Sequence, residues 1–287
     1  MMNERMRKLL TVALTMVFAV STALFIIRTF NSAEAADSYE AAEAIAARPR
    51  VTEAVEPTAS EQAGPIPTEP VPTEPRKKWV IAPVEEDESM KKLKEINLEA
   101  LREKNPDVVG WLFIPNTRIN YPIVQGTDNQ YYLNYTWDNR KSTAGAIFVE
   151  STNNPNFSDF RTIIYGHNMA DSSMFGSLHR YDSKDYRDKY PYVYLVTDEG
   201  VLRYEIYSSY KADVESGTYA LNLIEEPYRA AFIRLTKEEA LYETDITPAV
   251  ADRILTLSTC AGNASRRRVV HARLPMIQVE AKTDSLP

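Results

Sequence analysis

Cys260 is the single cysteine of this 287-residue sequence, and it stands where a strand-like run, residues 254–259, gives way to a loop. A strand end holds a side chain rigidly while the loop beside it leaves the side chain accessible, as a nucleophile requires. Arg266, Arg267 and Arg268 follow the loop, and guanidinium groups near a thiol favour the reactive thiolate. These neighbours suit a thiol nucleophile, and the alternative is a buried cysteine that packs as a small hydrophobe.

Three histidines could supply the acid or base that a thiol nucleophile needs. His167 follows a strand-like run and a glycine, so it also lies at a strand-to-loop junction. His271 lies within a strand-like run, on the same face as Arg267, because side chains alternate along a strand. His179 lies in a short helical stretch and is expected at the surface. From spacing alone we rank His167 first and His271 second.

The composition excludes several other classes of protein. With 44% hydrophobic and 25% charged residues the chain is typical of folded proteins. One cysteine cannot build an intramolecular disulfide framework, and together with three histidines it makes a metal cluster a poor hypothesis. The formal net charge of −7 gives no reason to expect nucleic-acid binding, which usually leaves a basic surface. We expect neither a metal nor a nucleic-acid partner.

The elements that must position these side chains are mostly strands. Residues 89–101 carry apolar side chains at helical spacing, and Pro106 ends that pattern. Residues 236–239 fit a capping box that opens a short helix. Strand character is found in seven runs: 119–124, 146–150, 162–165, 192–196, 202–210, 254–259 and 269–274. We predict one mostly β domain of about 200 residues, folded as a closed barrel or a sandwich.

The N-terminal residues indicate the cellular location of the protein. Residues 9–27 form an uncharged run that basic residues precede and Arg28 ends. As a helix this run is about 28 Å long, close to the ~30 Å hydrocarbon core of a bilayer. We expect residues 1–30 to form a cytoplasmic tail and a transmembrane signal-anchor, with the rest of the chain outside. The alternative is a signal peptide cleaved near residues 33–35, which would also export the domain.

Residues 31–88 have the composition of an extracellular linker. They are rich in Pro, Glu, Ala and Thr, and 8 of the 17 prolines of the chain fall between Pro49 and Pro83. Such a segment cannot bury enough apolar surface to offset its chain entropy, so we expect it to be disordered or extended. The folded domain would then comprise residues 89–287.

The residues around Cys260 resemble a known motif. The sequence TLSTC at residues 256–260 is similar to the TLxTC motif of sortases, the membrane-anchored cysteine transpeptidases of Gram-positive bacteria. The N-terminal anchor, the upstream His167 and an arginine after the cysteine are the context expected of that family. Three further segments resemble class B sortases in particular: residues 105–112, 119–125 and 165–178. The likeness covers about residues 89–278.

The resemblance implies a fold and a set of roles. It implies a closed eight-stranded β-barrel with added helices, in which Cys260 is the nucleophile and His167 the general acid/base. In the family the catalytic arginine stands five residues before a small Ala or Gly in the last strand, and counting back from Ala272 gives Arg267. The loop after Cys260 is shorter than expected for class B. Arg268 is therefore the second choice, and Arg266 is also possible.

The reaction that the resemblance implies is a transpeptidation without a cofactor. Cys260 would cleave a sorting motif after Thr, near the C-terminus of another secreted protein, and pass the acyl group to a cell-wall peptide amine of lipid II or the peptidoglycan cross-bridge. The expected location is the cell membrane of a Gram-positive bacterium, with the domain on its extracellular face. The alternatives are a pilin-polymerising sortase that uses a lysine amine, a secreted cysteine peptidase and, as the weakest, a membrane-tethered binding module.

Overall fold

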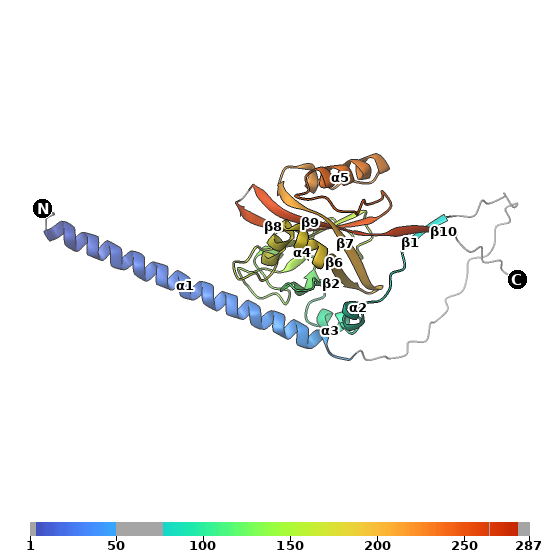
Figure 1. Cartoon of the computed structure of the whole chain (residues 1–287). Helices are drawn as coiled ribbons and strands as arrows, with labels where there is room; N and C mark the ends of the chain where they lie inside the picture. Colours follow the sequence, from blue (N-terminus) through green and yellow to red (C-terminus); the bar gives the residue numbers. More distant parts are fainter. Residues whose placement is uncertain (1–3, 50–76, 264, 281–287) are drawn as a thin grey trace.

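In the computed structural model of the chain, the strands that these apolar runs form pair into a closed β-barrel (Figure 1). The structure describes residues 4–49, 77–263 and 265–280, without the side chains of 4–12, 23–33, 77 and 260–263. The barrel order is β2-β3-β4-β5-β8-β9-β7-β6. Its strands are β2 (Val108–Phe113), β3 (Asn120–Val124), β4 (Ile147–Val149), β5 (Arg161–Gly166), β6 (Tyr192–Thr197), β7 (Gly200–Asp213), β8 (Arg253–Asn263) and β9 (Arg266–Leu274). The prediction of a closed eight-stranded barrel is confirmed.

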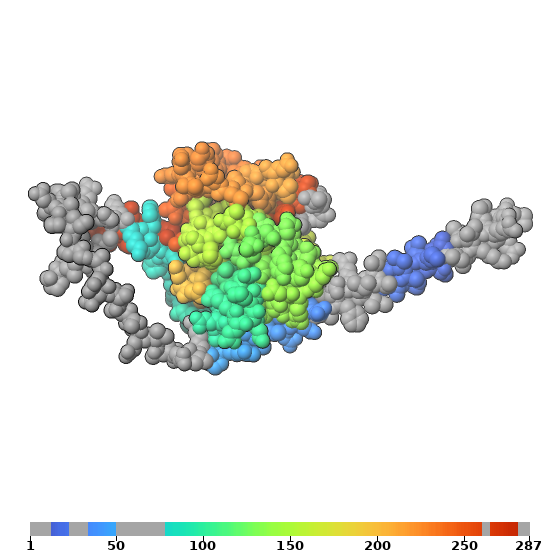
Figure 2. Space-filling model, turned by 180° about the vertical axis from the view of Figure 1, so that it is seen from behind, coloured from blue at the N-terminus to red at the C-terminus, as the bar shows by residue number. Residues whose placement is uncertain are grey.

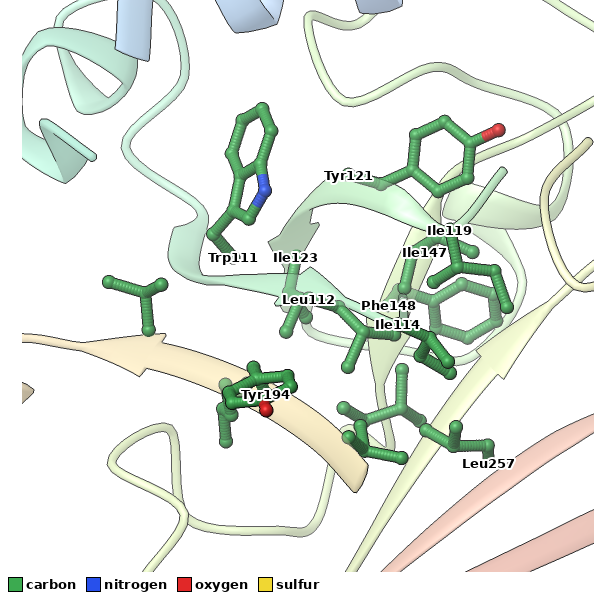
Figure 3. Packing of buried hydrophobic residues seen from close by; sticks show 14 of the residues in the cluster. Trp111, Leu112, Ile114, Ile119, Tyr121, Ile123, Ile147, Phe148, Tyr194 and Leu257 are labelled. Atoms are coloured by element: carbon green, nitrogen blue, oxygen red, sulfur yellow. The ribbon is translucent and has the colours of Figure 1, made fainter. Parts of the chain in front are cut away.

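The barrel interior is an apolar core. In Figure 3 the side chains of Leu112, Ile123 and Leu257 come from three different strands and gather in one cluster. All three are fully buried. In β7 the side chains alternate between the core and the surface, since Leu202 and Tyr204 are buried while Arg203 between them is not. The closed sheet leaves no barrel edge unpaired and gives the strand ends fixed positions.

Two helical predictions differ from the structure. The helical pattern in residues 89–101 is divided into α2 (Glu88–Leu93) and α3 (Leu98–Arg102), because the side chain of Asn97 caps α3 by accepting a hydrogen bond from the Ala100 amide. The capping-box prediction for residues 236–239 is wrong. These residues lie at the end of α5 (Glu226–Glu238), which begins with a proline in its first turn.

Smaller elements complete the domain. The helix α4 (Lys184–Lys189) and the 3-10 segments η1 (Tyr131–Leu133), η2 (Gly176–Asp182) and η3 (Gly217–Tyr219) lie in the connections between barrel strands. β1 (Lys77–Ile81) pairs antiparallel with β10 (Met276–Glu280), which places both ends of the domain side by side (Figure 1). β1 lies within the predicted linker and was not expected.

The N-terminal helix α1 (Glu4–Ala46) extends well beyond the predicted anchor. Its last turns lie against the barrel rather than in an extended linker (Figure 2), so the linker prediction is wrong for residues 31–46. Residues 50–76 of that linker lie outside the described residues. The predicted span, residues 9–27, includes side chains outside the described set. Among those described, we find no helix with the length and apolarity that a bilayer crossing demands.

Candidate active site

The ends of three neighbouring strands bring the predicted site residues together. β5 runs parallel to β8 with Gly166 opposite Thr259, and β9 runs antiparallel to β8 with Arg267 opposite Cys260. His167 follows Gly166 at the end of β5. Residues directly opposite each other in a ladder lie on one face of the sheet, with Cα atoms about 4.5–5.5 Å apart in an antiparallel pair. Position 260 therefore lies between His167 and Arg267, although the Cys260 side chain itself is outside the described residues.

His167 is held by its backbone and by its ring. The Phe175 amide donates a hydrogen bond to the His167 carbonyl at 2.9 Å. Preceding it, Gly166 has no room for a side chain, because a Cβ there would lie 2.9 Å from the Phe175 ring. The ring atom Nε2 lies 2.8 Å from the Leu133 carbonyl oxygen. A carbonyl can only accept, so Nε2 carries a proton and Nδ1 is the atom that can take up or release one.

The other two histidines are placed differently. His271 is fully buried on β9, where its ring nitrogens contact the hydroxyls of Thr256 at 3.0 Å and Tyr210 at 3.2 Å. Burial, with a further contribution from the charge of Arg161, lowers the pKa of His271 to about 3, so its ring is neutral. His179 is exposed, as expected, with Nδ1 2.7 Å from the Gly176 carbonyl. Of the three, only His167 lies at the strand ends beside Cys260.

The three consecutive arginines have different partners. Arg266 donates to the Lys211 carbonyl at 3.1 Å. Arg268 forms an ion pair with Asp182, and burial lowers its pKa. Arg267 places its guanidinium 5.9 Å from the centroid of the Tyr165 ring, and in the described part of the chain its buried Nε has no hydrogen-bond partner. Arg267 is thus the arginine that lies opposite Cys260.

Tyr165 and Glu150 support Arg267, and sequence reasoning missed both. Tyr165 donates its hydroxyl proton to Glu150 Oε2 at 2.9 Å, which fixes the ring beneath the guanidinium. Burial alone would raise the pKa of Glu150, but hydrogen bonds from Asn129, Tyr165 and Thr152 lower it below its ordinary value. An anion is therefore present on the far side of the ring. Tyr165 lies two residues before His167, and the strand period could have indicated that both lie on one face.

The chemistry that this arrangement allows is acyl transfer. It offers a cysteine position within β8, three residues before that strand ends at Asn263 and not at the strand end that the sequence predicted, with an imidazole on one side and a guanidinium on the other. Such a set can form a covalent intermediate, protonate a leaving group and stabilise a developing oxyanion. It uses three neighbouring strands, of which two are adjacent only because the barrel places β5 beside β8.

Comparison with known proteins shows which family the chain resembles. Residues 112–275 match the family model described as the sortase domain. The chain is 38% identical over 165 residues to sortase B of Listeria monocytogenes, a match that covers 57% of this chain and 66% of that protein. It is 30% identical over 179 residues to sortase B of Staphylococcus aureus, which covers 61% of this chain and 73% of that one.

Two solved structures are similar in fold as well as sequence. The Staphylococcus aureus sortase B-substrate complex matches with a TM-score of 0.59 and 30% identity, over 64% of this chain and 85% of that chain. A crystal structure of sortase B complexed with triglycine matches with a TM-score of 0.59 and 30% identity, over 63% and 86% of the two chains.

Proposed function

The chain belongs to the sortase family of cysteine transpeptidases, and we propose that it cleaves a C-terminal sorting motif after Thr and joins the Thr carbonyl to a cell-wall amine. The observation that supports this reaction most directly is the register of β5, β8 and β9. It places position 260 opposite Arg267 and beside the strand end that carries His167. We assign Cys260 as nucleophile, His167 as general acid/base and Arg267 as the stabiliser of the oxyanion.

The first half of the reaction forms a thioacyl enzyme. The Cys260 thiolate attacks the Thr carbonyl carbon and the carbonyl electrons move to oxygen. When that tetrahedral species collapses, the C–N bond breaks and His167 gives the proton on Nδ1 to the departing amine. The Thr acyl group is then bonded to sulfur and His167 is neutral. Two acyl transfers of this kind are each easier than one direct amide exchange.

The second half reverses the roles. An incoming amine attacks the thioester carbonyl, and the neutral Nδ1 of His167 takes the proton that the amine loses. Collapse expels the Cys260 thiolate and leaves a new amide. In both halves negative charge develops on the former carbonyl oxygen, where the guanidinium of Arg267 would stabilise it. The Nε2–Leu133 hydrogen bond keeps Nδ1 as the exchanging atom throughout.

The substrates are proposed by similarity. One of the matched sortase B structures is a substrate complex and another is a complex with triglycine. We infer a secreted protein with a C-terminal sorting signal as donor, and a peptide amine of lipid II or the peptidoglycan cross-bridge as acceptor. The uncharged run at residues 9–27 supports a single membrane anchor with the domain outside the cell, and the organisms of both relatives suit a Gram-positive cell wall.

The test uses the whole protein in detergent, with Cys260→Ala as the matched control. Peptides with Thr-Gly or Thr-Asn motifs are incubated with and without triglycine or a lysine peptide, and mass spectrometry follows the products. We expect a Cys260-dependent thioacyl adduct that passes to the amine. A preference for the lysine peptide would indicate pilus assembly, and hydrolysis that ignores the amines would indicate a peptidase. No adduct and no cleavage across the panel would contradict the proposal.

A further inference from the structure

The last turns of α1 carry a buried stripe that is not accounted for by membrane anchoring. Ala35, Tyr39, Ala42 and Ala46 recur at helical spacing and are buried, two of them completely. The stripe is held by polar contacts as well as packing. The Trp137 indole donates to the Ser38 carbonyl at 3.0 Å. These turns of α1 are therefore docked on the barrel as part of the domain (Figures 1 and 2).

Tyr39 is the member of the stripe whose polar atom reaches the barrel. Its ring packs edge-on against Tyr121, with the centroids 4.9 Å apart. Its hydroxyl donates a buried hydrogen bond to the Gly145 carbonyl at 2.7 Å. Burial is the main cause that raises the pKa of Tyr39 well above its ordinary value, and the neighbouring Tyr121 and Asp138 contribute less. The hydroxyl therefore keeps its proton, and remains a donor, at any pH at which the enzyme would work.

Gly145 lies against the ring of His167. Its φ is +58°, a conformation that glycine adopts without strain. A Cβ at this position would lie 2.8 Å from the Leu133 carbonyl oxygen and 3.0 Å from Cδ2 of His167. That carbonyl is the acceptor for Nε2 of the same ring. Gly145 thus lies close to both the imidazole and the group that fixes its tautomer, with no room for a side chain beside them.

We propose that Tyr39 is a positioning residue for His167, acting through the Gly145 backbone, so that the N-terminal helix is a working part of the catalytic site. The inference rests on the proposed function, in which His167 is the acid/base. The hydrogen bond from Tyr39 fixes the Gly145 carbonyl and with it the wall behind the imidazole. Without it, the wall is free to shift and Nδ1 spends less time aligned with Cys260. Misplacement of a catalytic group by a fraction of an ångström to an ångström lowers the rate while binding is unaffected.

The test compares Tyr39→Phe with a matched variant, Tyr186→Phe, in the full chain. The Tyr186 hydroxyl also donates to a backbone carbonyl, that of Asn116 at 3.1 Å, but it has no contact with His167. We measure kcat and KM for transpeptidation as functions of pH, and titrate the His167 ring by NMR. Tyr39→Phe should lower kcat about 5- to 10-fold, the range that one neutral hydrogen bond provides, with KM within about 2-fold. It should also shift the pH dependence of kcat and the His167 titration, whereas Tyr186→Phe should do neither.

A second variant tests the docking of the helix itself. Ala42→Arg places a charge in the buried stripe and should lift the last turns of α1, giving at least the same loss of kcat. The inference is overturned when Tyr39→Phe matches Tyr186→Phe in kcat and in the His167 titration, or when it changes only KM. His167→Ala, measured alongside, separates the two proposals. If that variant stays active, the assignment of His167 is wrong. If it is inactive while Tyr39→Phe behaves as wild type, only the role of Tyr39 is wrong.

Discussion

β8 and β9 share one face of the barrel sheet, and the two ends of that face differ in burial and in their polar residues. At one end His271 lies opposite Thr256, and at the other Arg267 lies opposite Cys260, four residues along the same strand and on the same face. α5 covers the first end, where the Phe232 ring meets the His271 ring at 5.8 Å. At the second end, the buried Nε of Arg267 has no hydrogen-bond partner among the residues that the structure describes. The His271 ring under the helix has hydrogen-bond partners for both of its nitrogens, whereas the Arg267 guanidinium beyond the helix lies opposite Cys260.

Replacing each of the two histidines in turn by alanine is the most severe test of this comparison. His167→Ala should reduce kcat by about 10²–10⁴-fold, the usual contribution of a positioned acid/base, and leave the melting temperature nearly unchanged. His271→Ala should do the reverse. It leaves a cavity and deprives Thr256 and Tyr210 of a partner, which costs about 2–4 kcal/mol of stability while the activity of the folded fraction persists. Steady-state kinetics and urea unfolding on both variants measure this. An inactive but stable His271→Ala would refute the comparison.

The adjacent arginines offer a narrower test. Arg267→Ala should lower kcat about 10²–10³-fold, as expected when an oxyanion donor is lost. Arg268→Ala breaks the ion pair with Asp182, whose side chain is more than a third exposed. The variant should therefore lose about 1 kcal/mol or less of folding stability and change kcat by about 3-fold at most. Both rates are measured with one peptide and one amine. If the two effects are interchanged, the role belongs to Arg268.

Lowering the pH should reduce the stability of the folded protein through His271, at the buried end of the face. The pKa of His271 is about 3 when folded and 6.5 as the ordinary value, so below pH 6.5 the unfolded chain takes up a proton that the folded chain refuses. This contribution to stability is complete above pH 6.5 and is lost as the pH falls towards 3, by at most about 1.4 kcal/mol per pH unit. Urea unfolding at pH 6.5 and pH 5 should show wild type losing about 1–2 kcal/mol more than His271→Asn. Equal losses would mean that His271 is not held neutral.

Much of the domain could be predicted from local pattern. The seven strand runs lie on or within a residue of barrel strands, because apolar alternation and β-branched residues act over a few neighbours. β2 lacks that signal, with a glycine at its centre, and β1 is a short edge strand that needs β10 to exist. The Ala-rich turns of α1 lie within the predicted linker. Their helical stripe is visible in the sequence, but small side chains predict no burial until a complementary surface is known.

The sequence by itself determined the chemistry: which residue types were available, and that His167 directly follows a strand, whereas Cys260 lies within β8 and not at its end. It also limited the arginine to three neighbours. Only the tertiary structure decided that β5 lies beside β8, that Arg267 rather than Arg268 is opposite Cys260, and that α5 covers His271. It alone brought Tyr39 to Gly145, across more than a hundred residues. The reason is physical: propensity and alternation are local, whereas strand order, helix cover and hydrogen-bond satisfaction depend on which surfaces pack together in the folded chain.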